Sequence, residues 1–95
     1  KWADVICLYP DRAVLAEVKI KLRPEAIGQL LVYRDLFNRT PRFSAWHKLP
    51  LTCIVAYAIG DPAVVQQCVQ QGIACEHYAP AWAREAYYKR IAHES

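Results

Sequence analysis

The stretch AVLAEVKIKLRPEAIGQLLVY, residues 13–33, predicts a strand that runs directly into a helix. From residue 13 to residue 22 apolar and charged side chains alternate, which is the period of a half-buried strand. Leu15 is the exception to this alternation. One face would carry Val14, Ala16, Val18, Ile20 and Leu22, and the other face would carry Glu17, Lys19 and Lys21.

The sequence Arg23-Pro24-Glu25 ends this strand and begins the helix. Proline is well suited to the first helical position, and an acidic side chain stabilises the first turn. The helix is expected to run to about Asn38, with one apolar stripe that can lie on a sheet. This stripe consists of Ala26, Leu30, Tyr33 and Phe37.

Length and composition indicate a single domain over residues 1–95. Hydrophobic residues make up 55% of the chain, which is enough for one core. A length of 95 residues is too short for a second domain. The net charge of +3 permits a polyanionic partner but is too small for binding nucleic acid by charge alone. The chain opens on Lys1 and enters an apolar segment almost at once, which is consistent with a domain cut from something longer.

The sequence argues against a membrane protein and against a disulfide-bonded one. No apolar run approaches the ~18 residues of a membrane helix, and no secretory signal is present. Cys7 and Cys53 lie in apolar runs, where a free thiol behaves as a small core side chain. The spacing of cysteines and histidines does not fit a metal site. We therefore expect no membrane partner, free thiols and a reducing compartment, the cytoplasm.

The rest of the chain predicts a mixed α/β sandwich with the order ββαβαβα. Residues 9–12 have a turn sequence, so the first two strands should form a hairpin. Asp61 and Gly72 suit the N-cap and the C-terminal end of a second helix. An apolar, β-branched run predicts a central strand covered on both faces. The other expected elements are strands at 2–8, 51–59 and 73–78 and helices at 62–71 and 80–92.

Residues 38–49 predict a loop in which positive charges are interleaved with aromatic rings. Such a loop can hold phosphates and stack on bases. It can also be an ordinary surface connection whose rings pack onto the core, and this is the plainer interpretation. The charged residues are Arg39, Arg42 and Lys48, and the rings belong to Phe43 and Trp46.

The hairpin is expected to bring two carboxylates together. If its turn is centred between Pro10 and Asp11, Asp4 lies directly across from Glu17, and cross-strand partners have Cβ atoms ~5 Å apart. Lys19 points to the same side as Glu17. Because buried charges are costly unless they pair or bind something, this group favours a bound divalent cation, Mg²⁺ or Mn²⁺. The plainer interpretation is a solvated strand face with an edge charge that discourages aggregation.

An acid on one strand, Glu17-Val18-Lys19 on the next and a helix soon after make the chain resemble the PD-(D/E)XK nuclease superfamily, over roughly residues 2–59. Gln29-Leu30-Leu31-Val32-Tyr33 is similar to the Q-x-x-x-Y of its RecB-like branch. The resemblance implies a restriction-endonuclease-like mixed sheet flanked by helices and hydrolysis of DNA by a Mg²⁺-activated water. It implies metal binding by Asp4, Glu17 and the Val18 carbonyl, with Lys19 as the catalytic lysine and Gln29 and Tyr33 near the site and the DNA backbone.

The chain departs from the superfamily pattern at its start. The superfamily core begins with a helix and a further strand, whereas residue 2 is already in the expected hairpin. Either the chain is truncated, or a partner supplies the missing layer, or the core is reduced; the partner would be a second copy or a larger protein assembly. The cysteines lack the close spacing of an iron–sulfur cluster, so none is assigned. Pro10-Asp11 is assigned to the turn.

Three functional hypotheses follow from the sequence. The first is a Mg²⁺-dependent nuclease acting on DNA. The second is a nuclease-fold module that no longer cuts and has a binding or structural role in a larger assembly. The third is an unrelated α/β protein in which the charges of Asp4, Glu17 and Lys19 form a solvated face.

Overall fold

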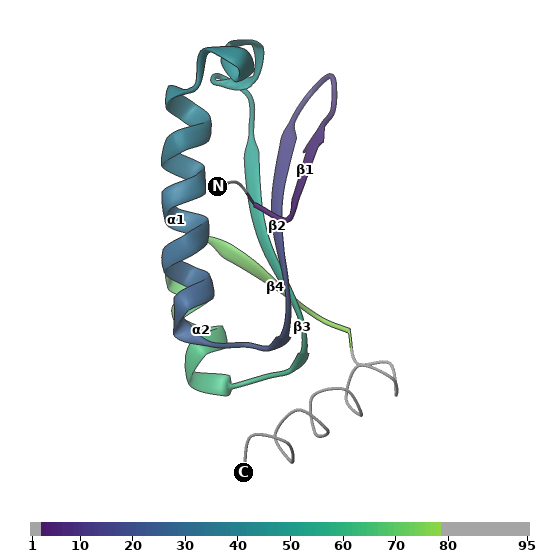
Figure 1. The fold of residues 1–95 in the computed structure, drawn as a ribbon, viewed down its shortest axis with the longest axis vertical. Coiled ribbons are helices and arrows are strands. Elements are labelled where there is room, and N and C mark those ends of the chain that lie inside the picture. Colours follow the sequence, from purple (N-terminus) through teal and green to yellow (C-terminus); the bar gives the residue numbers. More distant parts are fainter. Residues whose placement is uncertain (1–2, 79–95) are drawn as a thin grey trace.

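The computed structural model describes residues 3–78, which form a four-stranded mixed sheet with helices in the order ββαβαβ (Figure 1). The expected last helix, residues 80–92, lies outside the described residues, as does Trp2 at the expected start of the first strand. The elements are β1 (Val5–Leu8), β2 (Ala13–Lys21), α1 (Pro24–Arg39), the 3₁₀ helix η1 (Pro41–Trp46), β3 (Leu51–Ile59), α2 (Pro62–Gln70) and β4 (Ile73–His77).

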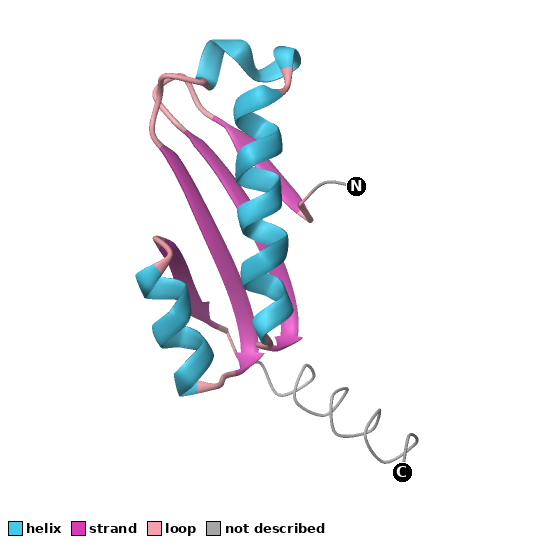
Figure 2. Cartoon of the chain, turned by 90° about the vertical axis from the view of Figure 1, so that its left-hand side faces the viewer, coloured by secondary structure: helices cyan, strands magenta, loops and turns pink. Residues whose placement is uncertain are grey.

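The strands lie in the order β1-β2-β3-β4, which makes β3 a central strand as predicted. β1 and β2 are antiparallel, and the predicted hairpin register is confirmed: Val5 faces Ala16 and Leu8 faces Ala13. The other two strand pairs are parallel, and each is connected through a helix. Figure 2 shows α1 and α2 on the same side of the sheet.

The helices cover the face of β2 that carries Leu15 and Glu17. Leu15 is fully buried and Glu17 is only 3% exposed, whereas Val18 on the other face is 61% exposed. The charged residues of β2 therefore do not lie on its solvated face, and this part of the strand prediction is wrong. The reason is that Ala13, Leu15 and Leu22 pack into the core together and hold Glu17 on the covered side.

The apolar stripe of α1 is confirmed, because Ala26, Leu30, Tyr33 and Phe37 are its buried residues. The helix ends at Arg39, and the Thr40 hydroxyl then donates a hydrogen bond to the Leu36 carbonyl. The stripe gives α1 one packing surface, which lies against β2 and β3.

One sequence expectation for the middle of the chain is corrected. The expected loop at residues 38–49 contains the 3₁₀ helix η1, because Pro41 starts a helical turn and Phe43 is drawn into the core beside Phe37. β3 is central, and the helices of residues 3–78 lie on one side of it; on its other face Thr52 is exposed and Ala58 is buried.

The predicted start and end of α2 are confirmed. The Asp61 carboxylate accepts a hydrogen bond from the Ala63 N–H at 3.0 Å, as an N-cap does, and Pro62 is the first helical residue. Gly72 has φ of +72°, a left-handed conformation that glycine adopts without strain. These two residues place β4 beside β3.

Replacing Leu30 by alanine should lower the free energy of unfolding by about 2–5 kcal/mol, because Leu30 is fully buried in the stripe of α1. Val32→Ala on the same helix is the matched control; Val32 is 56% exposed, so its loss should change stability by about 0.5 kcal/mol or less. Urea denaturation of both variants measures the difference. Similar losses in the two variants would contradict the packing of α1 described here.

Candidate active site

Asp4 and Glu17 are tied together by reciprocal hydrogen bonds at the open end of the hairpin. The Asp4 N–H donates to Glu17 Oε1 at 3.2 Å, and Asp4 Oδ2 accepts from the Val18 N–H at 3.0 Å. In an antiparallel ladder every second pair exchanges main-chain hydrogen bonds, so a main-chain acceptor would be expected opposite Val18. The Asp4 carboxylate fills that role where the chain leaves the ladder, just before Val5.

Glu17 is a buried carboxylate beside a second negative charge. Burial raises the pKa of Glu17 above its ordinary value, and the neighbouring charge of Asp4 raises the pKa further. The hydrogen bond from the Asp4 main chain and the positive charge of Lys19 act in the opposite direction. The net direction is upward, so the protein's own groups only partly compensate the negative charge at this place.

The Lys19 ammonium is the positively charged group beside Glu17. Its Nζ lies 3.6 Å from Glu17 Oε2, and its side chain is 32% exposed, so it contacts both the buried carboxylate and solvent. Lys21, two residues further along β2, is held differently: its Nζ donates to the Gly60 carbonyl at 3.0 Å. The two lysines of the strand therefore separate into one that faces Glu17 and one that ties β2 to the end of β3.

Gln29 and Tyr33 lie on the flank of α1 that faces away from α2. Arg34 marks the opposite flank, because its Nη1 donates to the Gln71 carbonyl at the end of α2. With 100° between successive residues, Gln29 and Arg34 lie on opposite sides of the buried stripe, and Tyr33 leans toward Gln29. The two residues of the predicted Q-x-x-x-Y motif thus lie on the side of β2 and β1.

The positions of Gln29 and Tyr33 along the length of β2 follow from the rise per residue of a strand and of a helix. β2 runs into α1 and α1 returns antiparallel to it (Figure 1). With ~3.3 Å per strand residue and ~1.5 Å per helical residue, Gln29 returns to about the level of Lys19 and Tyr33 to about the level of Glu17. Gln29 Oε1 is buried and, among residues 3–78, has no hydrogen-bond partner. Tyr33 is 5% exposed.

The burial of Glu17 was missed by the sequence analysis, and so was the use of the Asp4 carboxylate as an acceptor for the main chain. The signal for the first was Leu15, the apolar exception on the charged face of the strand. Its presence there indicates a packed face. The second depends on a bend at Asp4, for which the sequence carries no turn signal.

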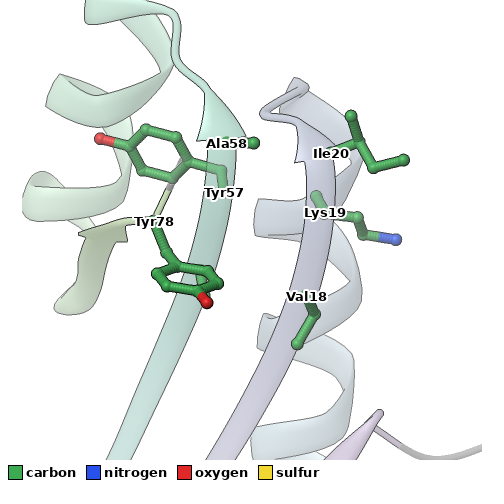
Figure 3. A pocket seen from close by; sticks show the side chains of 7 residues that line it. Val18, Lys19, Ile20, Tyr57, Ala58 and Tyr78 are labelled. Atoms are coloured by element: carbon green, nitrogen blue, oxygen red, sulfur yellow. The ribbon is translucent and has the colours of Figure 1, made fainter. Parts of the chain in front are cut away.

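A hollow of about 150 Å³ lies on the other side of the sheet (Figure 3). It is lined by Val18, Lys19, Ile20, Ala56, Tyr57, Ala58 and Tyr78. Because Val18 and Ile20 alternate with Glu17 and Lys19 along β2, this apolar hollow is separated by the sheet from the carboxylate of Glu17. Most of its surface is apolar, and Lys19, Tyr57 and Tyr78 are its polar side chains.

Other candidate sites are limited in the part of the chain that the structure describes. All four cysteines are free thiols, and burial raises the pKa of Cys68 to about 12. Within residues 3–78 no three histidine, cysteine or acidic side chains are grouped as metal ligands. In the same range no helix is long and apolar enough to cross a membrane.

Comparison with known proteins gives no relative for this chain: no family model, no curated protein and no solved structure matches it.

Replacing Glu17 by glutamine should raise the unfolding temperature at pH 7 in the presence of a chelator. The amide oxygen can still accept the Asp4 N–H, while the buried negative charge is removed. Asp35→Asn is the matched control, because Asp35 is an exposed carboxylate on α1. Differential scanning fluorimetry measures both variants. An unfolding temperature for Glu17→Gln below that of the unmodified chain would show that the charge itself stabilises the fold.

Proposed function

We propose that this chain is a nuclease domain with a restriction-endonuclease-like fold that hydrolyses DNA with the help of Mg²⁺ or Mn²⁺. One observation carries the proposal: Asp4, just before β1, and Glu17, in the middle of β2, are joined by reciprocal hydrogen bonds, and Lys19 lies 3.6 Å from Glu17. This is the set of groups that the resemblance to the PD-(D/E)XK superfamily assigns to the reaction.

The donor groups fit a hard divalent cation. Mg²⁺ is usually held by one or two carboxylates together with water and substrate phosphate, so two acids are sufficient. The upward shift of the Glu17 pKa has burial and the Asp4 charge as its main causes, and a cation beside both acids would offset that cost. Asp4, Glu17 and the Val18 carbonyl are the proposed ligands. When bound, the ion would lower the pKa of a water and polarise a phosphoryl oxygen.

Lys19 is the proposed catalytic lysine. In phosphodiester hydrolysis a water oxygen forms a bond to phosphorus while one P–O ester bond breaks, and the departing oxygen takes up a proton. The Lys19 ammonium has hydrogen-bond donors beside Glu17 and is one-third exposed. It is therefore suited to orient the water or to offset the negative charge that develops on the phosphate.

Gln29 and Tyr33 are proposed to contact the substrate strand. The buried Gln29 Oε1 has no hydrogen-bond partner among the described residues, and a buried polar atom without a partner is costly. Both residues lie on the flank of α1 that faces β2, at about the levels of Lys19 and Glu17. A water in the site would donate to Gln29 Oε1 the hydrogen bond it lacks, and the side-chain amide N–H groups would be the donors for a phosphate oxygen of DNA.

A second candidate function is a nuclease-fold module that does not cut. The same hydrogen bonds favour it, because they already satisfy one oxygen of each carboxylate and fasten the start of β1 to β2. In this role the acids stabilise a strand end, and the domain would act as a binding or structural part of a larger assembly or of a dimer. A crystal soaked in Mn²⁺ separates the two functions, since an ion bridging Asp4 and Glu17 is expected only for the first.

Glu17→Ala and Lys19→Ala should each abolish metal-dependent cleavage of labelled DNA while leaving the domain folded. Lys21→Ala is the matched control, because Lys21 lies on the same strand but bonds the Gly60 carbonyl, away from Glu17. Cleavage is followed on gels, and circular dichroism is recorded on the same samples. Full activity in both site variants would remove these residues from the mechanism and leave the non-cutting module as the better proposal.

Tyr33→Phe should weaken DNA binding or turnover while lowering stability by about 1 kcal/mol or less, if the hydroxyl faces substrate. Tyr78→Phe serves as the control, because Tyr78 is 66% exposed and lines the hollow on the opposite side of the sheet. A thermal melt beside a titration with labelled DNA gives both quantities. Lower stability with normal binding would mean that the Q-x-x-x-Y motif is a packing motif in this chain.

A further inference from the structure

A groove of about 540 Å³ lies between β1 and the 3₁₀ helix η1. Figure 1 shows η1 at the end of the sheet where the hairpin turn also lies. The floor of the groove is apolar and its other side is aromatic and cationic. The groove is lined by Ile6, Leu8, Arg42, Phe43 and Trp46.

This groove lies on the same side of the sheet as the candidate active site, further along β1. Asp4, Ile6 and Leu8 occupy alternate positions, so their side chains follow one side of the strand. Ile6 faces Leu15 across the hairpin and packs against the helix-covered core, which places the groove on the same side of the sheet as Glu17. At ~3.3 Å per residue, Ile6 lies roughly 7 Å and Leu8 roughly 13 Å from Asp4 along the strand.

Trp46 presents a fixed ring to the groove. Its Nε1 donates a hydrogen bond to the Tyr9 carbonyl at 2.9 Å, across the turn of the hairpin. The side chain is half-buried, and its one polar atom is satisfied by this bond. Phe43 behind it is 3% exposed and stacks on Phe37 with ring centroids 4.7 Å apart. Phe43 is therefore part of the hydrophobic core, and Trp46 is the aromatic ring in the groove that a ligand can contact.

Arg42 places a positive charge at the rim of the groove. It is exposed, and its guanidinium lies over the ring of Phe43, 4.9 Å from the centroid. No carboxylate forms an ion pair with Arg42 within residues 3–78. Stacking orients an arginine and leaves its N–H donors free, which suits a phosphate.

We infer that this groove binds an unpaired nucleobase and the adjoining phosphate of single-stranded DNA. In this arrangement the base stacks on Trp46 over the apolar floor of Ile6 and Leu8, and Arg42 binds the phosphate. The base must be unpaired, because both faces of a base are covered inside a duplex and sequence-tolerant stacking on aromatic rings is typical of single-strand binding. The identity of the ligand as DNA rests on the proposed nuclease function.

The first test measures binding without cleavage. Fluorescence anisotropy of a labelled 15-mer of thymidylate is recorded with the full chain in EDTA, beside a duplex of equal length and a 15-mer of abasic sugar-phosphate. The thymidylate strand should bind most tightly. Trp46→Leu should weaken its binding roughly tenfold and should leave binding of the abasic strand nearly unchanged, because only the base stacks.

The second test concerns the phosphate. Arg42→Ala should weaken binding of both single strands, and it should reduce the slope of log affinity against log salt by roughly 0.7, the value for one phosphate contact on a single strand. Arg23→Ala is the matched control, because it removes an exposed arginine from the opposite end of α1. Arg42→Lys should keep the salt slope. Thermal melts of all variants exclude unfolding as the cause.

The outcomes separate the groove from the chemistry. Suppose that the Trp46 and Arg42 variants lose binding and that the unmodified chain does not cleave DNA in Mg²⁺ or Mn²⁺. This result would support single-strand binding in the groove and contradict the proposed nuclease activity. Suppose instead that the unmodified chain cleaves DNA and that folded Trp46→Leu and Arg42→Ala bind normally. This result would contradict single-strand binding in the groove and support the proposed nuclease activity. Equal affinity for the duplex and the single strand would also overturn the groove, whatever the activity.

Discussion

The reciprocal hydrogen bonds between Asp4 and the Glu17-Val18 segment are the constraint on which the site depends. They hold a carboxylate on the covered face of β2 and a second one at the end of β1, where neither side chain can swing away without leaving an amide N–H without its acceptor. One of these hydrogen bonds is part-buried and the other is exposed, and together they keep the two acids close through the main chain. The fold thus holds two like charges near each other in spite of their repulsion.

The topology explains why Asp4 is exposed while Glu17 beside it is buried. α1 packs its stripe on β2 and β3, and the path of the chain through α2 extends the sheet on the far side, at β4. β1 is left at the edge, where within residues 3–78 neither α-helix makes extensive contact with it. The space over β1 is bounded instead by η1, on the side of the sheet that carries Glu17. One edge strand therefore carries both the proposed chemistry and the proposed binding surface.

The sequence predicted the elements better than it predicted their exposure. The hairpin register followed from a local turn, and the buried stripe of α1 followed from helical spacing; both are properties of neighbouring residues. The covered face of β2 did not follow, because alternation shows two faces and does not say which one a distant helix will cover. The 3₁₀ helix was missed because Phe43 is fixed by Phe37, a contact that local sequence patterns do not encode.

The sequence separation of the contacts has a consequence for the order in which the molecule assembles. Asp4 and Glu17 are 13 residues apart, whereas Trp46 reaches Tyr9 across 37 residues and requires α1 and η1 to be in place. Closing a short loop costs less conformational entropy than closing a long one. We expect the acids to meet early in folding, in a hairpin, and the groove to close late. A chain that has folded only in part would then bring its acids together before it has a surface to hold a strand.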